Sequence, residues 1–156
     1  EFDAIDGACG RVGHGQSLGA VGCHTGAVHR EIEPATIAPP AANYAHAVLS
    51  EDTRVWLHTS GVVPTRPDGT VPDELAEQAR TVWANLMAML DEAQMTASDV
   101  VSVTTYVVVD HMAALPSVMQ ARDRALDGHR AASTLVTVPA LARPEWKMEI
   151  ALVAAR

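Results

Sequence analysis

The spacing of apolar and polar positions changes several times along the chain, and each spacing predicts one type of element. Between residues 73 and 93, apolar side chains recur at steps of three and four, which is the spacing of one helix face. Pro72 fits the first turn of this helix. Residues 100–109 are rich in β-branched side chains and predict a central strand. A second helix is predicted at 115–126, and four further strands are predicted at 44–50, 54–63, 132–138 and 146–153.

The predicted elements follow the order β-β-α-β-α-β-β. Two helices and several strands indicate an α+β fold in which both helices cover one face of a sheet. The side chains on the opposite face are largely apolar, so a monomer would expose them to water. We therefore expect oligomerisation to bury this face.

Residues 1–29 differ in composition from the rest of the chain. Seven of the ten glycines lie there, and the apolar residues show neither helical nor strand spacing. Because glycine loses the most conformational freedom on ordering, this composition favours a mobile arm. The chain starts with Glu1-Phe2 instead of methionine, which leaves a vector origin of the arm open. The folded body is predicted to cover residues 30–156 and to begin with an extended segment at 32–40.

Charge and hydropathy limit the classes of partner. The net charge is −8, and Lys147 is the sole lysine. Nucleic-acid binding through a basic face is therefore disfavoured, because phosphate neutralisation needs clustered Lys and Arg. No apolar run approaches the roughly 20 residues that span a bilayer, and residues 1–30 lack the basic start and apolar stretch of a signal peptide. We expect a cytoplasmic protein without membrane contact.

The two cysteines lie in the glycine-rich arm together with three histidines. Thiolate and imidazole groups are the usual ligands of zinc. The spacing of Cys9, His14, Cys23, His24 and His29 lacks a C-x₂₋₄-C unit, however, and it does not argue for a disulfide either. We predict neither a metal site nor a cofactor.

Four motifs, in order, resemble the Rid family of YjgF-like imine deaminases. Residues 43–48 (Asn-Tyr-Ala-His-Ala-Val) resemble the family's Gly-Pro-Tyr-Ser-Gln-Ala-Val, and residues 60–64 (Ser-Gly-Val-Val-Pro) resemble Ser-Gly-Gln-Ile-Pro. Residues 77–101 follow the family's helix and next strand. Residues 130–133 (Arg-Ala-Ala-Ser) stand where the family carries Pro-Ala-Arg-Ser. The resemblance covers roughly residues 31–154, and it is carried by matching spacing as well as by the motifs.

The resemblance implies a chorismate-mutase-like fold and a homotrimer. In such a trimer three sheets close around a barrel-like core, helices lie outside, and small-molecule ligands bind in clefts between adjacent subunits. Family deaminases hydrolyse reactive enamines and imines, such as 2-aminoacrylate, to a 2-keto acid and ammonia. This chemistry needs a cation for the carboxylate, a positioned water and a group that moves a proton.

Three residues match the family's site. Glu149 aligns with the glutamate that positions water, and Tyr44 aligns with a cleft tyrosine that can donate a hydrogen bond. Ser60, next to Gly61, aligns with a serine that contacts ligand. Each match also has a structural interpretation: a barrel-lining carboxylate, a core or interface aromatic side chain, and a hydrogen bond at a strand end.

Two positions depart from the family's pattern, and a third could compensate for one of the departures. Ala132 replaces the arginine that holds the substrate carboxylate, and Met119 falls where many members have a cleft asparagine. Arg130 lies two residues before Ala132 and points to the same strand face, so it could supply a displaced cation. The alternative for Arg130 is an exposed residue at the start of a strand.

Three functions therefore stay open. The first is a deaminase-like hydrolase that acts on a substrate other than a simple 2-imino acid. The second is a non-catalytic small-molecule-binding trimer, for which Ala132 and Met119 favour an uncharged or partly apolar ligand. The third is an endoribonuclease or translation inhibitor, an activity attributed to some family members, and the acidic charge counts against it.

Overall fold

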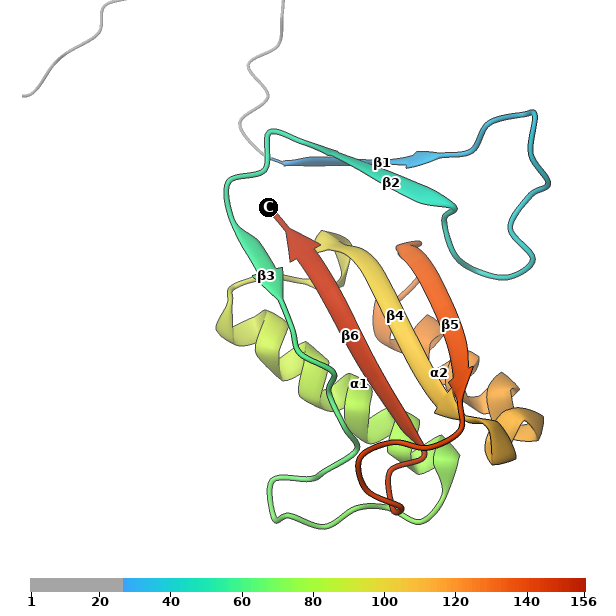
Figure 1. Ribbon diagram of the computed structural model, residues 1–156. Coiled ribbons are helices and arrows are strands. Elements are labelled where there is room, and N and C mark those ends of the chain that lie inside the picture. The colour runs from blue at the N-terminus through green and yellow to red at the C-terminus, as the bar shows by residue number, and fades with distance from the viewer. Residues whose placement is uncertain (1–26) are drawn as a thin grey trace, which may run out of the picture.

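A four-stranded mixed sheet with both helices on one face forms the body of the molecule (Figure 1). The computed structural model describes residues 27–156. The strands follow the order β3-β6-β4-β5 across the sheet, and β4 and β5 are parallel while the other neighbours are antiparallel. The elements are β3 (Trp56–His58), α1 (Leu75–Glu92), η1 (Ala97–Asp99), β4 (Val100–Val108), η2 (Val109–Ala114), α2 (Leu115–Leu126), β5 (Ala132–Val138) and β6 (Met148–Ala155). The predicted α+β class, with two helices on one face, is confirmed.

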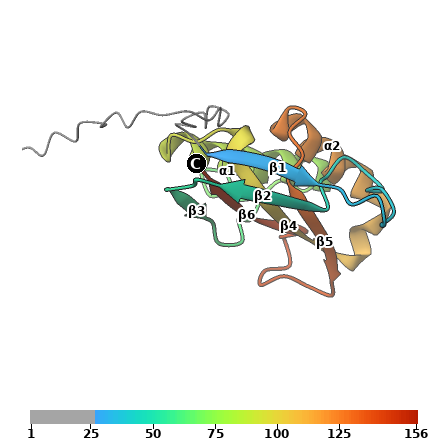
Figure 2. The same cartoon turned by 90° about the horizontal axis from the view of Figure 1, so that it is seen from above.

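One additional strand was not predicted. β1 (Val28–Ile32) pairs antiparallel with β2 (Ala47–Glu51), and this two-stranded ribbon lies across one end of the main sheet (Figure 2). The order is therefore β-β-β-α-β-α-β-β. The sequence of β1 is short and mostly polar, so its spacing carries no strand signal. Its conformation comes from non-local contacts, including the His29 ring, which lies 3.0 Å from Ser50 Oγ and 2.7 Å from the Ala155 carbonyl oxygen.

The strand predicted at 54–63 is shorter than expected. β3 ends at His58, and pairing with β6 resumes only at Val62, which forms an isolated bridge with Ile150. The Thr59 amide donates to the Leu152 carbonyl and the Val62 amide donates to the Ile150 carbonyl. Between these two hydrogen bonds the chain advances by three residues from Thr59 to Val62 but by only two residues along β6. Such a mismatch is the signature of a β-bulge. The extra residue falls at Ser60-Gly61.

The core lies between α1, α2 and the helix-facing side of the sheet. The periodic positions Val82, Trp83, Leu86 and Leu90 of α1 are all buried, as the spacing predicted. On β6 the buried residues alternate with half-buried ones, so that Ile150 and its alternate neighbours face the helices. Within residues 27–156, neither helix is both long enough and apolar enough to cross a membrane.

Gln78 of α1 joins the loop before the helix to the loop before β6. Its side chain is fully buried, and its amide nitrogen donates to the carbonyls of Pro72 and Glu145. Its amide oxygen accepts from the backbone amide of Lys147 at 2.9 Å. All the hydrogen bonds that a buried amide requires are thus directed to backbone groups, and the start of β6 is held against α1.

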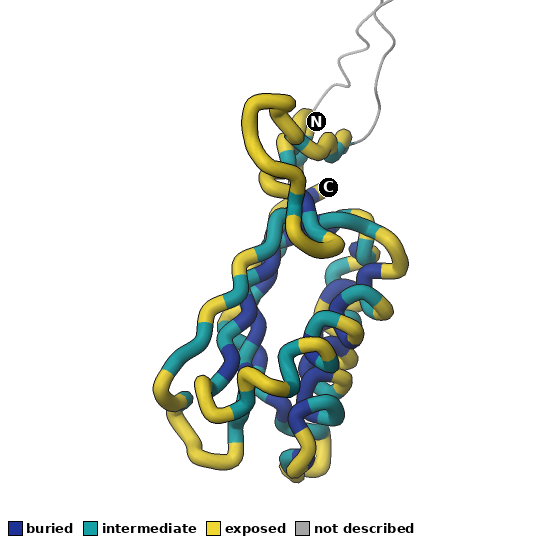
Figure 3. The backbone as a smooth tube through the Cα atoms, turned by 90° about the vertical axis from the view of Figure 1, so that its right-hand side faces the viewer, coloured by how far each residue is buried: buried dark blue, intermediate teal, exposed yellow. Residues whose placement is uncertain are grey.

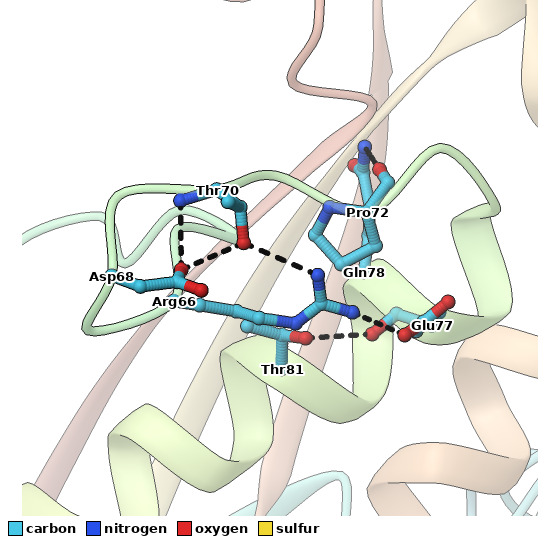
Figure 4. Close-up of polar contacts among 7 residues, drawn as sticks. All are labelled: Arg66, Asp68, Thr70, Pro72, Glu77, Gln78 and Thr81. Atoms are coloured by element: carbon cyan, nitrogen blue, oxygen red, sulfur yellow. Dashed lines mark hydrogen bonds and ion pairs between the residues drawn. The ribbon is translucent and has the colours of Figure 1, made fainter.

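The loop before α1 is closed by a second set of polar contacts (Figure 4). Arg66 pairs with Glu77 in the first turn of α1, and it also donates to the Thr70 hydroxyl. The Thr70 hydroxyl and amide both donate to Asp68, and these hydrogen bonds lower the pKa of the Asp68 carboxyl from its ordinary value. This loop leads from the bulge at Ser60-Gly61 back to the helix.

The sheet face opposite the helices is open in the single subunit (Figure 3). It was predicted to be largely apolar, but the structure shows a mixed face. Trp56 and Val136 are 50% and 40% exposed there. Polar side chains of β4 and β6 alternate with valine and alanine on the same face, among them Ser102, Thr104 and Glu149.

Candidate functional site

The carboxylate of Glu149 lies directly against the backbone of Gly61. A Cβ atom placed on Gly61 would lie only 1.6 Å from Glu149 Oε1, so the glutamate side chain occupies the space that any larger residue would need. The bulge at Ser60-Gly61 turns this glycine toward β6. The two residues that the sequence predicted as site members are therefore in contact within one subunit.

The Glu149 side chain is half-buried. In the part of the chain that the structure describes, its side chain takes part in no hydrogen bond or ion pair. Tyr106 stands directly opposite Glu149 in the antiparallel pairing of β4 with β6, and directly opposite side chains share one face of the sheet. Sequence analysis missed Tyr106, because only the register between two distant strands places it beside Glu149.

Tyr44 and Ala132 lie together at the other end of the sheet. The backbone amide of Ala45 donates to the Ala131 carbonyl at 3.1 Å, and Ala45 forms a parallel bridge with Ala132. The Tyr44 ring packs edge-on against His46, with 5.7 Å between the ring centroids. This end of the sheet therefore carries the tyrosine but not the carboxylate.

The predicted site residues form two separate groups within one subunit. Ala132 is level with Ser102 and Val153 across the sheet, whereas Glu149 is level with Tyr106. Val153 and Glu149 are four positions apart on β6, which corresponds to about 13 Å along a strand. A side chain at position 132 and the Glu149 carboxylate consequently cannot contact the same small ligand within one subunit.

An open groove of about 460 Å³ lies beside Ala132, between the ribbon and the open face of the sheet. Trp56 stacks on His58 at its edge, with 6.2 Å between the ring centroids. Among residues 27–156, no Lys or Arg lines the groove. The lining residues are His46, Ala47, Val48, Ser50, Trp56, Val101, Ser102, Ala132 and Val153.

Arg130, the candidate for a displaced cation, is held by the ribbon. One terminal nitrogen lies 2.9 Å from Glu31 Oε2, and the other lies 2.6 Å from Glu33 Oε1. The second nitrogen also donates to the Tyr44 carbonyl at 2.8 Å. Arg130 is therefore neither a solvent-exposed residue nor a free cation.

Arg122 of α2 is a second arginine near this end of the sheet. It is 4% exposed, and it donates to the Asn43 carbonyl at 2.7 Å and to Asp123. One contact of each arginine is with a backbone carbonyl of this segment, that of Asn43 for Arg122 and that of Tyr44 for Arg130. Two arginines thus fasten the segment that carries the predicted tyrosine.

The remaining predicted residues are dispersed. Ser60 is exposed and lies on the bulge beside Gly61. Met119 lies on α2, in the helix layer, on the other side of the sheet from Glu149. Of the five zinc-capable residues of the arm, Cys9, His14, Cys23 and His24 fall outside the described residues.

Two helices cover one face of a mixed sheet, and a carboxylate of that sheet lies against a glycine in a β-bulge. This arrangement is that of an α+β protein. The family model described as Endoribonuclease L-PSP matches residues 35–156. The chain belongs to this family, which is the YjgF-like or Rid family.

Known relatives agree with this assignment. A Rid-family protein of unknown function, YyfB from Yersinia pestis, has a TM-score of 0.76 and 32% identity, and the match covers 82% of this chain and 98% of that one. A RutC family protein of Haemophilus influenzae is 37% identical over 51% of this chain and 57% of its own length. A RutC family protein of Pasteurella multocida is 33% identical over 53% and 60%. The chain thus spans somewhat more than half the length of these curated relatives.

Proposed function

We propose that the protein is a deaminase-like hydrolase that acts on the C=N bond of a substrate without a carboxylate group. The observation that carries this proposal is the Glu149 carboxylate, which rests on Gly61 and has no partner among residues 27–156. A carboxylate on an open sheet face that no protein group binds is free to accept hydrogen bonds from water or a ligand. Position 149 is also where the family's water-positioning glutamate stands.

The proposed chemistry needs one water molecule and one proton carrier. Glu149 accepts a proton from water as the oxygen adds to the imine carbon, and the C=N double bond becomes a C–N single bond. Glu149 returns this proton to the nitrogen, which gives a neutral carbinolamine. Glu149 then moves the hydroxyl proton to the same nitrogen, the C–N bond breaks, the carbonyl forms and ammonia leaves. The backbone next to Gly61 and the nearby Tyr106 are the groups of the same subunit that could orient the substrate.

The complete cleft is proposed to lie between two subunits of a homotrimer. Proteins of this family are oligomeric. The separation of Glu149 from the Tyr44 and Ala132 group supports this assembly, because a second subunit could bring its own Tyr44 end to the Glu149 end of the first. The open sheet face, with Trp56 half exposed, offers the surface for such contact.

The absence of a cation from the groove beside Ala132 supports an uncharged substrate. A carboxylate bound there would lack the bidentate partner that arginine supplies. A non-catalytic small-molecule-binding trimer is the second candidate, and the mainly apolar lining of the groove favours it. An endoribonuclease is a weaker candidate, since a net charge of −8 opposes binding of a polyanion.

Restoring the family arginine tests the proposal. We expect the wild-type protein not to accelerate hydrolysis of freshly generated 2-aminoacrylate, and we expect Ala132→Arg to accelerate it. Adding Glu149→Gln to Ala132→Arg should abolish the gain, because the carboxylate is then lost while the arginine remains. Ammonia release measures each reaction.

Two outcomes would contradict the proposal. Rapid hydrolysis of 2-aminoacrylate by the wild-type protein would exclude the uncharged-substrate class. No gain in a folded Ala132→Arg variant would argue against retained hydrolytic machinery. Neutral imines that raise the melting temperature of the wild-type protein but release no ammonia would favour the non-catalytic candidate.

A further inference from the structure

Two glutamates, Glu31 in β1 and Glu33 just after it, pair with the two terminal nitrogens of Arg130. Glu31 Oε2 lies 2.9 Å from one terminal nitrogen, and Glu33 Oε1 lies 2.6 Å from the other. A ligand carboxylate that binds the guanidinium end-on would need the same two nitrogens. The protein's own carboxylates thus stand where a charged ligand would bind this arginine.

Arg130 is placed within reach of the groove. It precedes Ala132 by two residues, and Ala131 between them is 2% exposed, so Arg130 and Ala132 point to the same side of an extended segment. Two extended residues span about 7 Å, which an arginine side chain can cover. The covalent geometry of the chain does not keep Arg130 out of the groove. Its ion pairs with Glu31 and Glu33, together with its hydrogen bond to the Tyr44 carbonyl, hold it against the ribbon.

We propose that Glu31 and Glu33 are specificity-determining residues that sequester Arg130 and thereby keep the groove selective for uncharged ligands. This inference rests on the proposed function, because it explains which substrates the same site rejects. Both glutamates precede residue 35, where the match to the family model begins. The selectivity is therefore set by a segment outside the matched region.

The test removes both negative charges and leaves the arginine. The Glu31→Gln/Glu33→Gln variant is compared with the wild-type protein in binding of pyruvate, measured by calorimetry, and in hydrolysis of 2-aminoacrylate. We expect both to rise by about tenfold or more, since a released guanidinium regains a charge-assisted bidentate contact. Adding Arg130→Met should return both values to the wild-type level.

A matched control separates release of Arg130 from a general change of charge. Asp91→Asn/Glu92→Gln removes the same number of charges at the far end of α1 and should leave both values unchanged. The ion pairs are partly exposed, with side-chain exposure of 30% for Arg130, so the double variant is expected to fold. If it does not, Glu33→Gln alone releases one nitrogen and should give a smaller rise in the same two measurements.

The outcomes distinguish this inference from the proposed function. No rise in the folded glutamine variants, together with a rise in Ala132→Arg, would overturn the role of Glu31 and Glu33 and leave the proposed function standing. No rise in either would overturn both. A rise that persists after Arg130→Met would also overturn the inference, because Arg130 would then not be the cation that binds the ligand.

Discussion

At the scale of single residues, the candidate site depends on one close contact. The Glu149 carboxylate occupies the space that a side chain at position 61 would need. Its φ lies outside the left-handed region, so glycine is needed here for space and not for backbone conformation. The contact explains why a glycine stands at the bulge.

The first prediction concerns Gly61→Ala. The new methyl group would displace Glu149, and we expect a loss of about 1–2 kcal/mol in the free energy of unfolding from overpacking. Combining it with Glu149→Ala should cost less than the sum of the two single changes, because the clash disappears with the carboxylate. Urea unfolding of the four proteins in this cycle measures the coupling, and strict additivity would show that the two residues do not touch.

Individual residues of the site were partly predictable. Glu149 and Gly61 stand in motifs that the resemblance identified, and alternation along the last strand placed Glu149 away from its buried neighbours. Tyr106 was not predictable as a neighbour of Glu149, because the register between two strands far apart in sequence carries no local signal. The ion pairs of Arg130 also depend on β1, whose polar sequence gave no strand pattern.

At the scale of elements, the start of β6 is positioned by α1. Gln78 is the connecting residue, since its three hydrogen bonds reach Pro72, Glu145 and Lys147. Glu149 follows Lys147 by two residues, so this connection fixes where β6 begins. The helix itself was predictable from its apolar spacing, but a buried glutamine on the core side interrupts that pattern and shows its role only in the structure.

Replacing Gln78 with leucine tests this connection. The buried Lys147 amide and two carbonyls would lose their partner, and we expect a loss of about 2–4 kcal/mol in the free energy of unfolding. Gln120→Leu is the matched control, because Gln120 is exposed on α2 and should change stability by less than about 0.5 kcal/mol. Equal stability of the two variants would mean that Gln78 does not hold the loops.

At the scale of the whole molecule, the fold separates the two halves of the proposed site. The Glu149 end and the Ala132 end lie at opposite ends of one open face, and both residues are half-buried in the single subunit. The α+β class and the order of the main elements followed from the spacing of apolar residues. The division of the site within one subunit could not be predicted in this way, because it depends on strand register, which local patterns do not encode.

Complementation between subunits tests most directly whether Glu149 and position 132 of two different subunits form one site. Wild-type chains carry Glu149 but lack an arginine at position 132, and Ala132→Arg/Glu149→Gln chains carry the arginine but lack the carboxylate. Each protein alone is expected not to hydrolyse 2-aminoacrylate. After the two are unfolded together and refolded, we predict that hydrolysis appears, because one subunit supplies the arginine and its neighbour supplies Glu149. If the mixed oligomers stay inactive while Ala132→Arg alone is active, the site lies within one subunit and the account is wrong.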